Sequence, residues 1–206
     1  TTRVPADWTL TATPQGITGQ DPVSGNGDPA TPGGVDAVEV FAGNYRLSET
    51  GPAGFDGSLW QCTGGVVADD VVTVPNAGNV TCTITNTAVA PTLTLVKQVD
   101  DPNNMGTAVA TDWTLSASGP SPINGVTGSP AVTAAAVEVG EYTLSESGPA
   151  NYTASDWRCV AADQSPVAVT DDAVTLAEGD NVTCTVVNTP VPPQWAISKS
   201  SNPLSG

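Results

Sequence analysis

The sequence predicts an all-β protein built from two tandem β-sandwich repeats with Greek-key connections and roughly seven short strands in each repeat. Three observations predict this fold. The chain repeats itself at an offset of about 100 residues. Thr, Val, Ala, Gly, Pro and Ser dominate the composition, which favours strands and turns over helices. Short apolar runs are bounded by clusters of Gly, Pro, Asn and Asp, as strands in a sandwich are.

The internal repeat is visible at several anchors along the chain. Residues 6–10 align with residues 111–115, and both segments contain Asp-Trp-Thr-Leu. Residues 79–87 align with residues 181–189 and are nearly identical to them. Agreement at several separate anchors indicates a tandem duplication.

One strand does not follow the repeat boundaries. The segment Leu-Thr-Leu-Val-Lys at 93–97 returns as Trp-Ala-Ile-Ser-Lys at 195–199, but nothing similar precedes Trp8. We therefore expect repeat 1 at residues 1–90 to lack its own first strand and repeat 2 at 91–191 to be complete. Residues 192–206 are expected to be the first strand of a third repeat, and a candidate donor strand for repeat 1 of another molecule.

The charge of the chain excludes several classes of partner. The formal charge is −16, with five cationic residues and no histidine, so nucleic acid and anionic lipid would be repelled. No long apolar run and no signal-peptide pattern occurs, and the sequence is expected to be an internal fragment without a membrane-inserted segment. No cofactor is expected.

The four cysteines fall as one pair in each repeat. Cys62 is expected to pair with Cys82, and Cys159 with Cys184. Without histidine or a Cys-x-x-Cys motif a zinc site is a poor explanation, so disulfides are the better one. Disulfides require an oxidising setting, which predicts an extracellular location.

Three polar residues of repeat 2 are predicted to point into the core. Side chains alternate between the two faces of a strand, so the apolar positions identify the inward face. Lys97 shares that face with two leucines, Glu146 with a tyrosine and a leucine, and Asn188 with two valines and a cysteine. A Lys, a Glu and an Asn are therefore expected to meet inside repeat 2.

Repeat 1 carries part of the same set. Glu49 and Asn86 occupy the equivalent inward positions, and its missing lysine has an equivalent in Lys199. The chain contains only two lysines, and both occupy this one repeated position. We therefore expect Glu49, Asn86 and Lys199 to form the same kind of site, with an intermolecular cross-link as one outcome.

Buried charges are costly, so such a cluster implies either a hydrogen-bonded network or a reaction that removes the charges. An apolar surround favours a neutral amine and a neutral carboxyl group. The Lys97 amine could then attack the Asn188 carboxamide, with Glu146 as the catalytic acid and ammonia as the leaving group. Two alternatives stay open: an unreacted buried ion pair capped by Asn188, and a Lys97 side chain that reaches solvent from a strand end.

These residues resemble the Cna B-type, or SpaA-type, prealbumin-like repeats of Gram-positive surface adhesins and pilins, over essentially the whole chain. The similar motif is Tyr-x-Leu-x-Glu followed by Gly-Pro and an aromatic residue, at Tyr142 to Tyr152 and at Tyr45 to Phe55. In that family a first-strand Lys bonds to a last-strand Asn with help from this Glu. Gly-Pro stands where the family often has Ala-Pro, and the disulfides are typical of actinobacterial members.

The resemblance implies Ig-like or prealbumin-like sandwiches that act as structural stalk or shaft repeats of a bacterial surface adhesin or pilus-like filament. Neighbouring repeats would be the partners, and polymers could form by strand addition. No turnover on a separate substrate is expected, since each Lys and Asn reacts once. The alternative is a ligand-binding adhesin module that uses the loops at 13–36 and 118–133, which differ between the repeats.

Two further groups of residues have a structural and a functional interpretation. Trp8, Trp60, Trp113 and Trp157 recur in register, which favours core packing over a ligand platform, and Trp195 is placed with them. The acidic pairs at 69–70, 100–101 and 171–172 are either solvated turns or weak calcium ligands, and turns are favoured because no spaced ligand set accompanies them.

Overall fold

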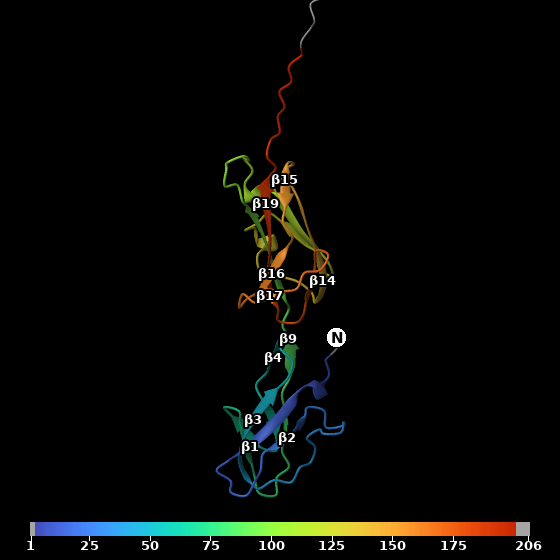
Figure 1. Cartoon of the computed structure of the whole chain (residues 1–206). Coiled ribbons are helices and arrows are strands. Elements are labelled where there is room, and N and C mark those ends of the chain that lie inside the picture. Colours follow the sequence, from blue (N-terminus) through green and yellow to red (C-terminus); the bar gives the residue numbers. More distant parts are fainter. Residues whose placement is uncertain (1–2, 201–206) are drawn as a thin grey trace, which may run out of the picture. The chain divides into compact units, whose positions relative to one another are not determined.

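The computed structural model describes residues 3–200 and forms two compact units, Thr1–Val89 and Ala90–Gly206. Each unit is built from short strands (Figure 1). In the described residues the only helices are three single 3₁₀ turns: η1 (Pro5–Asp7), η2 (Ala110–Asp112) and η3 (Pro130–Val132). No helix in this part of the chain is long and apolar enough to cross a membrane. The all-β prediction is confirmed.

Unit 2 is a sandwich of two sheets. Its strands are β10 (Thr92–Val99), β11 (Thr114–Ser118), β12 (Ile123–Gly125), β13 (Ala135–Ala136), β14 (Gly140–Ser147), β15 (Tyr152–Ala154), β16 (Arg158–Ala161), β17 (Pro166–Val167), β18 (Ala173–Leu176) and β19 (Asn181–Pro190). One sheet has the order β13-β10-β19-β16-β17, with β15 also on β19, and the other has the order β12-β11-β14-β18. The first and last strands, β10 and β19, are parallel neighbours.

The core of unit 2 lies between these sheets and follows the alternation of each strand. Leu93 and Leu95 on β10 are fully buried, while Thr94 between them is only half-buried. Along β19 the alternate residues from Val182 to Val186 are buried in the same way. Removing this apolar surface from water is the main source of stability, at about 25 cal/mol per Å².

Unit 1 repeats only part of this arrangement. Its strands are β1 (Thr9–Gln15), β2 (Val23–Asn26), β3 (Gly43–Thr50), β4 (Phe55–Gly57), β5 (Gln61–Thr63), β6 (Val66–Ala68), β7 (Val71–Val74), β8 (Thr81–Thr83) and β9 (Asn86–Ala88). One sheet is intact, with the order β2-β1-β3-β7-β6, and β1 runs beside β3 (Figure 1). The facing layer consists of two separate pairs, β4-β9 and β5-β8.

The broken layer of unit 1 has a physical cause. Residues 3–8 contain no strand equivalent to β10, so β8 and β9 are paired along one edge only within the described residues. Where unit 2 has one continuous β19, unit 1 has two three-residue strands. Val80 and Ile84 stay half-buried, while their equivalents Val182 and Val186 are buried.

The strand number differs from the roughly seven expected for each repeat. Among residues 3–200 the structure has nine strands in unit 1 and ten in unit 2, because several expected strands are divided, as the last strand of unit 1 is into β8 and β9. The acidic pair Asp69–Asp70 forms a turn, as expected. Both residues have positive φ, 50° and 60°, and they join β6 to β7 as a two-residue hairpin loop. Asp171 and Asp172 have similar angles, 49° and 59°.

The aromatic residues mostly follow the prediction. Trp8, Trp60, Trp113 and Trp157 are buried, as core residues are. Trp195 differs, since 80% of it is exposed. Residues 191–200 form no strand, so Trp195 has no sheet to pack on. Whether residues 192–206 begin a third repeat stays a prediction, and residues 201–206 lie outside the described part of the chain.

The open layer of unit 1 predicts faster hydrogen exchange there. In the dilute, monomeric chain the amides of β8 and β9 should exchange at least ten times faster than those of β19, because β19 is hydrogen-bonded on both sides. Exchange followed by mass spectrometry on peptides from 81–88 and 183–190 measures this difference. Equal protection of the two segments would contradict the description of unit 1 as an open layer.

Candidate cross-linking site

Three strands of unit 2 deliver the candidate residues to one place. Lys97 is the third inward residue of β10, and Asn188 lies near the end of the neighbouring strand β19. In the parallel register Lys97 faces Val186, so Asn188 is the next inward residue along β19. Glu146 comes from β14 in the opposite sheet and reaches across the core. The three residues that the sequence singled out therefore lie together.

The Glu146 carboxylate joins the other two groups. Its Oε2 accepts a hydrogen bond of 2.6 Å from Lys97 Nζ, and its Oε1 accepts one of 2.7 Å from Asn188 Nδ2. The Lys97 side chain is fully buried, Asn188 is 2% exposed, and the Glu146 side chain is 15% exposed. The alternative in which the Lys97 side chain reaches solvent is therefore wrong. An unreacted ion pair and the precursor of a cross-link would both have this geometry.

The burial of Lys97 shifts its amine toward the neutral form. Burial lowers the pKa of the amine from its ordinary value, and the hydrogen bond and charge of Glu146 offset part of that shift. The amine also lies over the ring of Trp113, 4.9 Å from its centroid, and this π-face favours the cation. A neutral amine has the free electron pair that a nucleophile needs.

The carboxamide of Asn188 is only partly satisfied. Its Nδ2 donates to Glu146, but its buried Oδ1 has no hydrogen-bond partner. An unpaired buried carbonyl oxygen costs about 1–3 kcal/mol. The site thus contains a buried amine, a bridging carboxylate and a carbonyl group that lacks a donor.

An aromatic frame holds the amine in place. The Trp113 ring meets Tyr152 edge-on, with centroids 5.1 Å apart, and the Tyr152 hydroxyl accepts a hydrogen bond of 3.0 Å from the Ala108 amide. The ring of Trp113 also lies against Gly148, where an added Cβ would be 2.5 Å from Trp113 Cδ1. This contact explains Gly-Pro in the motif, since alanine would displace the indole.

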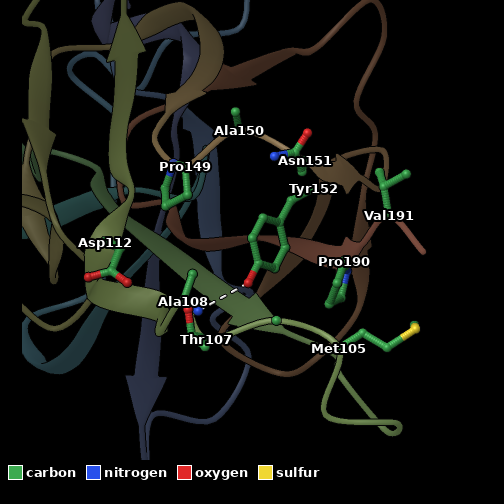
Figure 2. Close-up of a pocket in the computed structure, with 11 residues that line it drawn as sticks. Met105, Thr107, Ala108, Asp112, Pro149, Ala150, Asn151, Tyr152, Pro190 and Val191 are labelled. Carbon is green, nitrogen blue, oxygen red and sulfur yellow. Dashed lines mark hydrogen bonds between the residues drawn. The ribbon is translucent and has the colours of Figure 1, made fainter. Parts of the chain in front are cut away.

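A hollow of about 410 Å³ lies on the outer side of this frame. Figure 2 shows Tyr152 in this hollow, with Pro149 and Ala150 on one side and Pro190 on the other. Two polar groups there have protein partners: the Tyr152 hydroxyl bonds to Ala108 (Figure 2), and Asp112 accepts a hydrogen bond from the Val109 amide. The hollow adjoins the packing of Trp113 through Tyr152.

The comparison with known families agrees with this architecture. The profile of a family described as a SpaA-type prealbumin-like fold domain matches residues 1–84 and again residues 89–186. The chain belongs to this family. The expected prealbumin-like sandwich is thereby confirmed for both repeats, and the chain consists of two SpaA-type domains. No curated protein matches the chain.

The chain is weakly similar to solved structures of major pilins of Streptococcus pyogenes. The major pilin protein T3.2 is 16% identical, with 90% of each chain covered and a TM-score of 0.36. The major pilin protein T-13 is 15% identical, with 89% of each chain covered and a TM-score of 0.35. A further major pilin is 12% identical over 89% of this chain and 91% of its own, with a TM-score of 0.34. At these scores the likeness does not extend to function.

The first SpaA-type domain contains the same site without its lysine. Asn86 Nδ2 donates a hydrogen bond of 2.9 Å to Glu49 Oε2. Trp8 meets Phe55 edge-on at 5.2 Å and 86°, which matches the 86° between Trp113 and Tyr152. Lys199 is exposed in the segment after β19 and belongs to the other unit. Glu49 and Asn86 are thus brought together, and the role of Lys199 stays a prediction.

Each SpaA-type domain carries one disulfide, as predicted. Cys62 bonds to Cys82 between β5 and β8, and Cys159 bonds to Cys184 between β16 and β19. The bridges close loops of 20 and 25 residues. In the chain-entropy model each such bridge stabilises the folded state by about 3 kcal/mol. Within the described residues no group of three or more acidic, Cys or His side chains is arranged to hold a metal ion.

Two residues of the site escape a prediction from strand alternation. Trp113 precedes β11 and Gly148 follows β14, so neither lies within a strand whose alternation could assign it to a face. A signal was nonetheless present, because Trp-Thr-Leu and Gly-Pro recur together in both repeats.

The contact between Trp113 and Gly148 predicts the effect of Gly148→Ala. The added methyl group would push the indole away from Lys97 and strain the core, which lowers the free energy of unfolding by about 1–3 kcal/mol. Urea unfolding followed by tryptophan fluorescence measures this loss. The exposed neighbour Ser147 provides the control, since Ser147→Ala should change stability little. Equal effects of the two substitutions would contradict the close contact.

Proposed function

We propose that this chain forms stalk or shaft domains of a bacterial cell-surface adhesin or pilus-like filament, and that an amide bond between Lys97 and Asn188 reinforces the second domain. The observation that carries the proposal is the single Glu146 carboxylate, which contacts the buried amine and the buried carboxamide at once. Membership of the SpaA-type family and the two disulfides agree with it.

The proposed reaction begins with transfer of a proton from Lys97 Nζ to Glu146, which leaves a neutral amine and a neutral acid. A half-turn of the Asn188 carboxamide then lets the acid donate to Oδ1, the atom that has no partner in the ground state. This hydrogen bond draws electrons from the carbonyl carbon and prepares it for attack.

The bond-forming step balances without any other reactant. Nζ attacks Cγ of Asn188, a new C–N bond forms, and the Cγ–Nδ2 bond breaks. Glu146 carries a proton from the attacking nitrogen to the departing one, so ammonia leaves and Glu146 stays the neutral acid that the first proton transfer made. It becomes a carboxylate again only when that proton passes to the ammonia or to solvent. Because one Lys and one Asn are consumed, the site acts once and does not turn over a separate substrate.

The reaction also removes an energetic cost. A buried ion pair loses the hydration of both charges, and its mutual attraction repays this only in part. The amide product is neutral, and it closes a loop of about 90 residues, which stabilises the folded state by roughly 4–5 kcal/mol if it acts as a disulfide of that loop length does.

The position of the bond suits a domain that carries load. β10 and β19 are the first and last strands of unit 2 and lie side by side in parallel. A bond between them lets tension enter at β10 and leave at the end of β19 without pulling the strands apart. The rest of the sandwich would then carry little force.

A stalk role also agrees with the setting that the disulfides require. Disulfides persist outside the reducing cytosol, so the domains are proposed to act at the bacterial cell surface, with neighbouring repeats as partners. The alternative of ligand binding through loops 13–36 and 118–133 has less support, because neither loop contains an aromatic residue.

The cross-link predicts the mass of the intact chain. With its disulfides reduced, the wild-type chain should be lighter than its formula mass by about 17 Da, the mass of one ammonia. Lys97→Ala and Asn188→Ala should each have their full formula mass, and Glu146→Ala should lose the ammonia slowly or not at all. Mass spectrometry of the denatured monomer measures the intact mass of the wild-type chain and of the three variants.

The matched control is Lys199→Ala, which removes the other lysine and should keep the loss of about 17 Da. A wild-type chain at its full formula mass would overturn the proposal and leave repeat 2 with an unreacted ion pair.

The stalk role predicts a difference under force. With the disulfides reduced, pulling on the two ends of Lys97→Ala should extend repeat 2 completely, whereas the wild-type chain should keep about 90 residues closed, or about 300 Å of chain. Single-molecule force spectroscopy measures this length. Unfolding steps of equal length in the two chains would contradict a load-bearing bond.

A further inference from the structure

The loop that follows β2 in the first SpaA-type domain contains a peptide bond between an aspartate and a proline, Asp28 and Pro29. This loop, residues 26–34, is closed by hydrogen bonds from the backbone and the side chain of Asn26. The corresponding loop of the second domain, residues 118–133, contains no acidic residue. The Asp–Pro bond is therefore a feature of the first domain alone at this place in the fold.

The carboxylate of Asp28 is held beside this bond. Its Oδ1 accepts a hydrogen bond of 3.0 Å from the Ala30 amide, so the ring that this hydrogen bond closes contains the peptide between Asp28 and Pro29. Asp28 is half-buried, and its own amide donates to Asn26 Oδ1 at 2.9 Å, which fixes the residue on its other side. A nucleophile held beside its target reacts as if it were present at very high concentration. The carboxylate is thus placed to attack the main-chain carbonyl carbon of its own residue.

The carbonyl oxygen of Asp28 faces two donors from Thr31. The Thr31 amide lies 3.1 Å from it and the Thr31 hydroxyl 3.0 Å. The hydroxyl also lies 3.1 Å from Asn26 Oδ1, so its one proton is shared between two acceptors. Both donors face the oxygen on which negative charge develops when the carbonyl carbon is attacked. Gly34 packs on this peptide, since a Cβ there would be 2.8 Å from the Asp28 carbonyl carbon.

The other two Asp–Pro bonds of the chain, at 21–22 and 101–102, lack this combination. Both carboxylate oxygens of Asp101 accept backbone amides of residues 105–106, at 2.8 Å each, so they are occupied by later residues of that loop. Asp21 is exposed, and no hydrogen bond within residues 3–200 holds its carboxylate beside the bond. Asp28 alone combines a carboxylate held over its own peptide with a carbonyl that two donors face.

We propose that the first domain cleaves its own chain between Asp28 and Pro29. Oδ1 of Asp28 attacks the main-chain carbonyl carbon of the same residue, and negative charge develops on the oxygen that faces Thr31. The C–N bond to Pro29 then breaks, and the proline nitrogen takes a proton from solvent. A cyclic anhydride is left on Asp28, and water opens it to two carboxyl groups. The sum of these steps is hydrolysis of one peptide bond.

Cleavage would break the covalent chain inside the first domain without separating its two parts. β1 and β2 precede the cut, while β3 follows it and pairs with β1 over seven residues. All four cysteines lie after the cut, so neither disulfide joins the parts. In a cleaved domain, tension is therefore carried by strand pairing and packing alone. The site makes the first domain a point at which a loaded chain can be released.

The test follows the mass of the full chain during incubation in the most acidic buffer in which tryptophan fluorescence shows it folded. The buffer supplies the proton that the Pro29 nitrogen takes. The wild-type chain should give two fragments, residues 1–28 and 29–206, whose summed mass exceeds that of the uncut chain by one water. The folded chain should be cut about ten times faster than the chain in urea at the same pH, because unfolding removes the contacts of Ala30 and Thr31. The rate should not depend on chain concentration.

Variants of two residues separate the parts of the site. Asp28→Ser keeps an oxygen for the Ala30 amide but has no carboxylate, so it should not be cut. Thr31→Val removes the hydroxyl and should slow the cut about tenfold, whereas Thr31→Ser keeps the hydroxyl and should restore the rate. The bond at 101–102 is the internal control, since it should be cut no faster in the folded chain than in urea.

Three results would overturn the proposal. The first is a folded wild-type chain that stays uncut. The second is equal cutting after Asp28 in the folded chain and in urea, because the fold would then contribute nothing to the reaction. The third is cleavage of Asp28→Ser at the wild-type rate, because another nucleophile or a protease would then make the cut. None of these results bears on the bond between Lys97 and Asn188, whose loss of ammonia is measured separately.

Discussion

The structure depends on a carboxylate that reaches across a dry core to an amine and a carboxamide on the opposite sheet. Glu146 contacts Lys97 and Asn188 at hydrogen-bond distances, and the Lys97 side chain is fully buried. Burying these groups is costly unless they are paired or made neutral. The surrounding packing follows from this constraint, since Trp113 covers the amine and Gly148 leaves space for the indole.

The two domains show what the first strand contributes. Where β10 is present, β19 is continuous and its inward residues are buried; in unit 1 the corresponding layer is divided into short pairs and its inward residues are half-buried. Glu49 and Asn86 nevertheless keep the arrangement of their equivalents. The carboxylate and the carboxamide are therefore positioned by the intact sheet and the disulfide-linked strands, and the lysine strand completes the sandwich.

Much of this arrangement could be predicted from the sequence because alternation assigns each strand residue to a face. Lys97, Glu146 and Asn188 lie on the same strand faces as their apolar neighbours. Equivalent residues recur at the duplicated positions, which argues against a chance placement. Trp113 and Gly148 lie just outside strands, where alternation has no meaning, so their contact needed coordinates. The strand number differs from the expectation because several strands are divided, as the last strand of unit 1 is into β8 and β9. Trp195 is exposed because residues 191–200 join no sheet, so its place in a core stays a prediction.

The most direct measurement is peptide mapping of the reduced chain by tandem mass spectrometry after trypsin digestion. Trypsin does not cut after an acylated lysine, so the account predicts one branched fragment in which residues 47–158 are joined to residues 159–199 through Nζ of Lys97 and Cγ of Asn188. Linear peptides that end at Lys97, together with peptides that contain an unchanged Asn188, would contradict it.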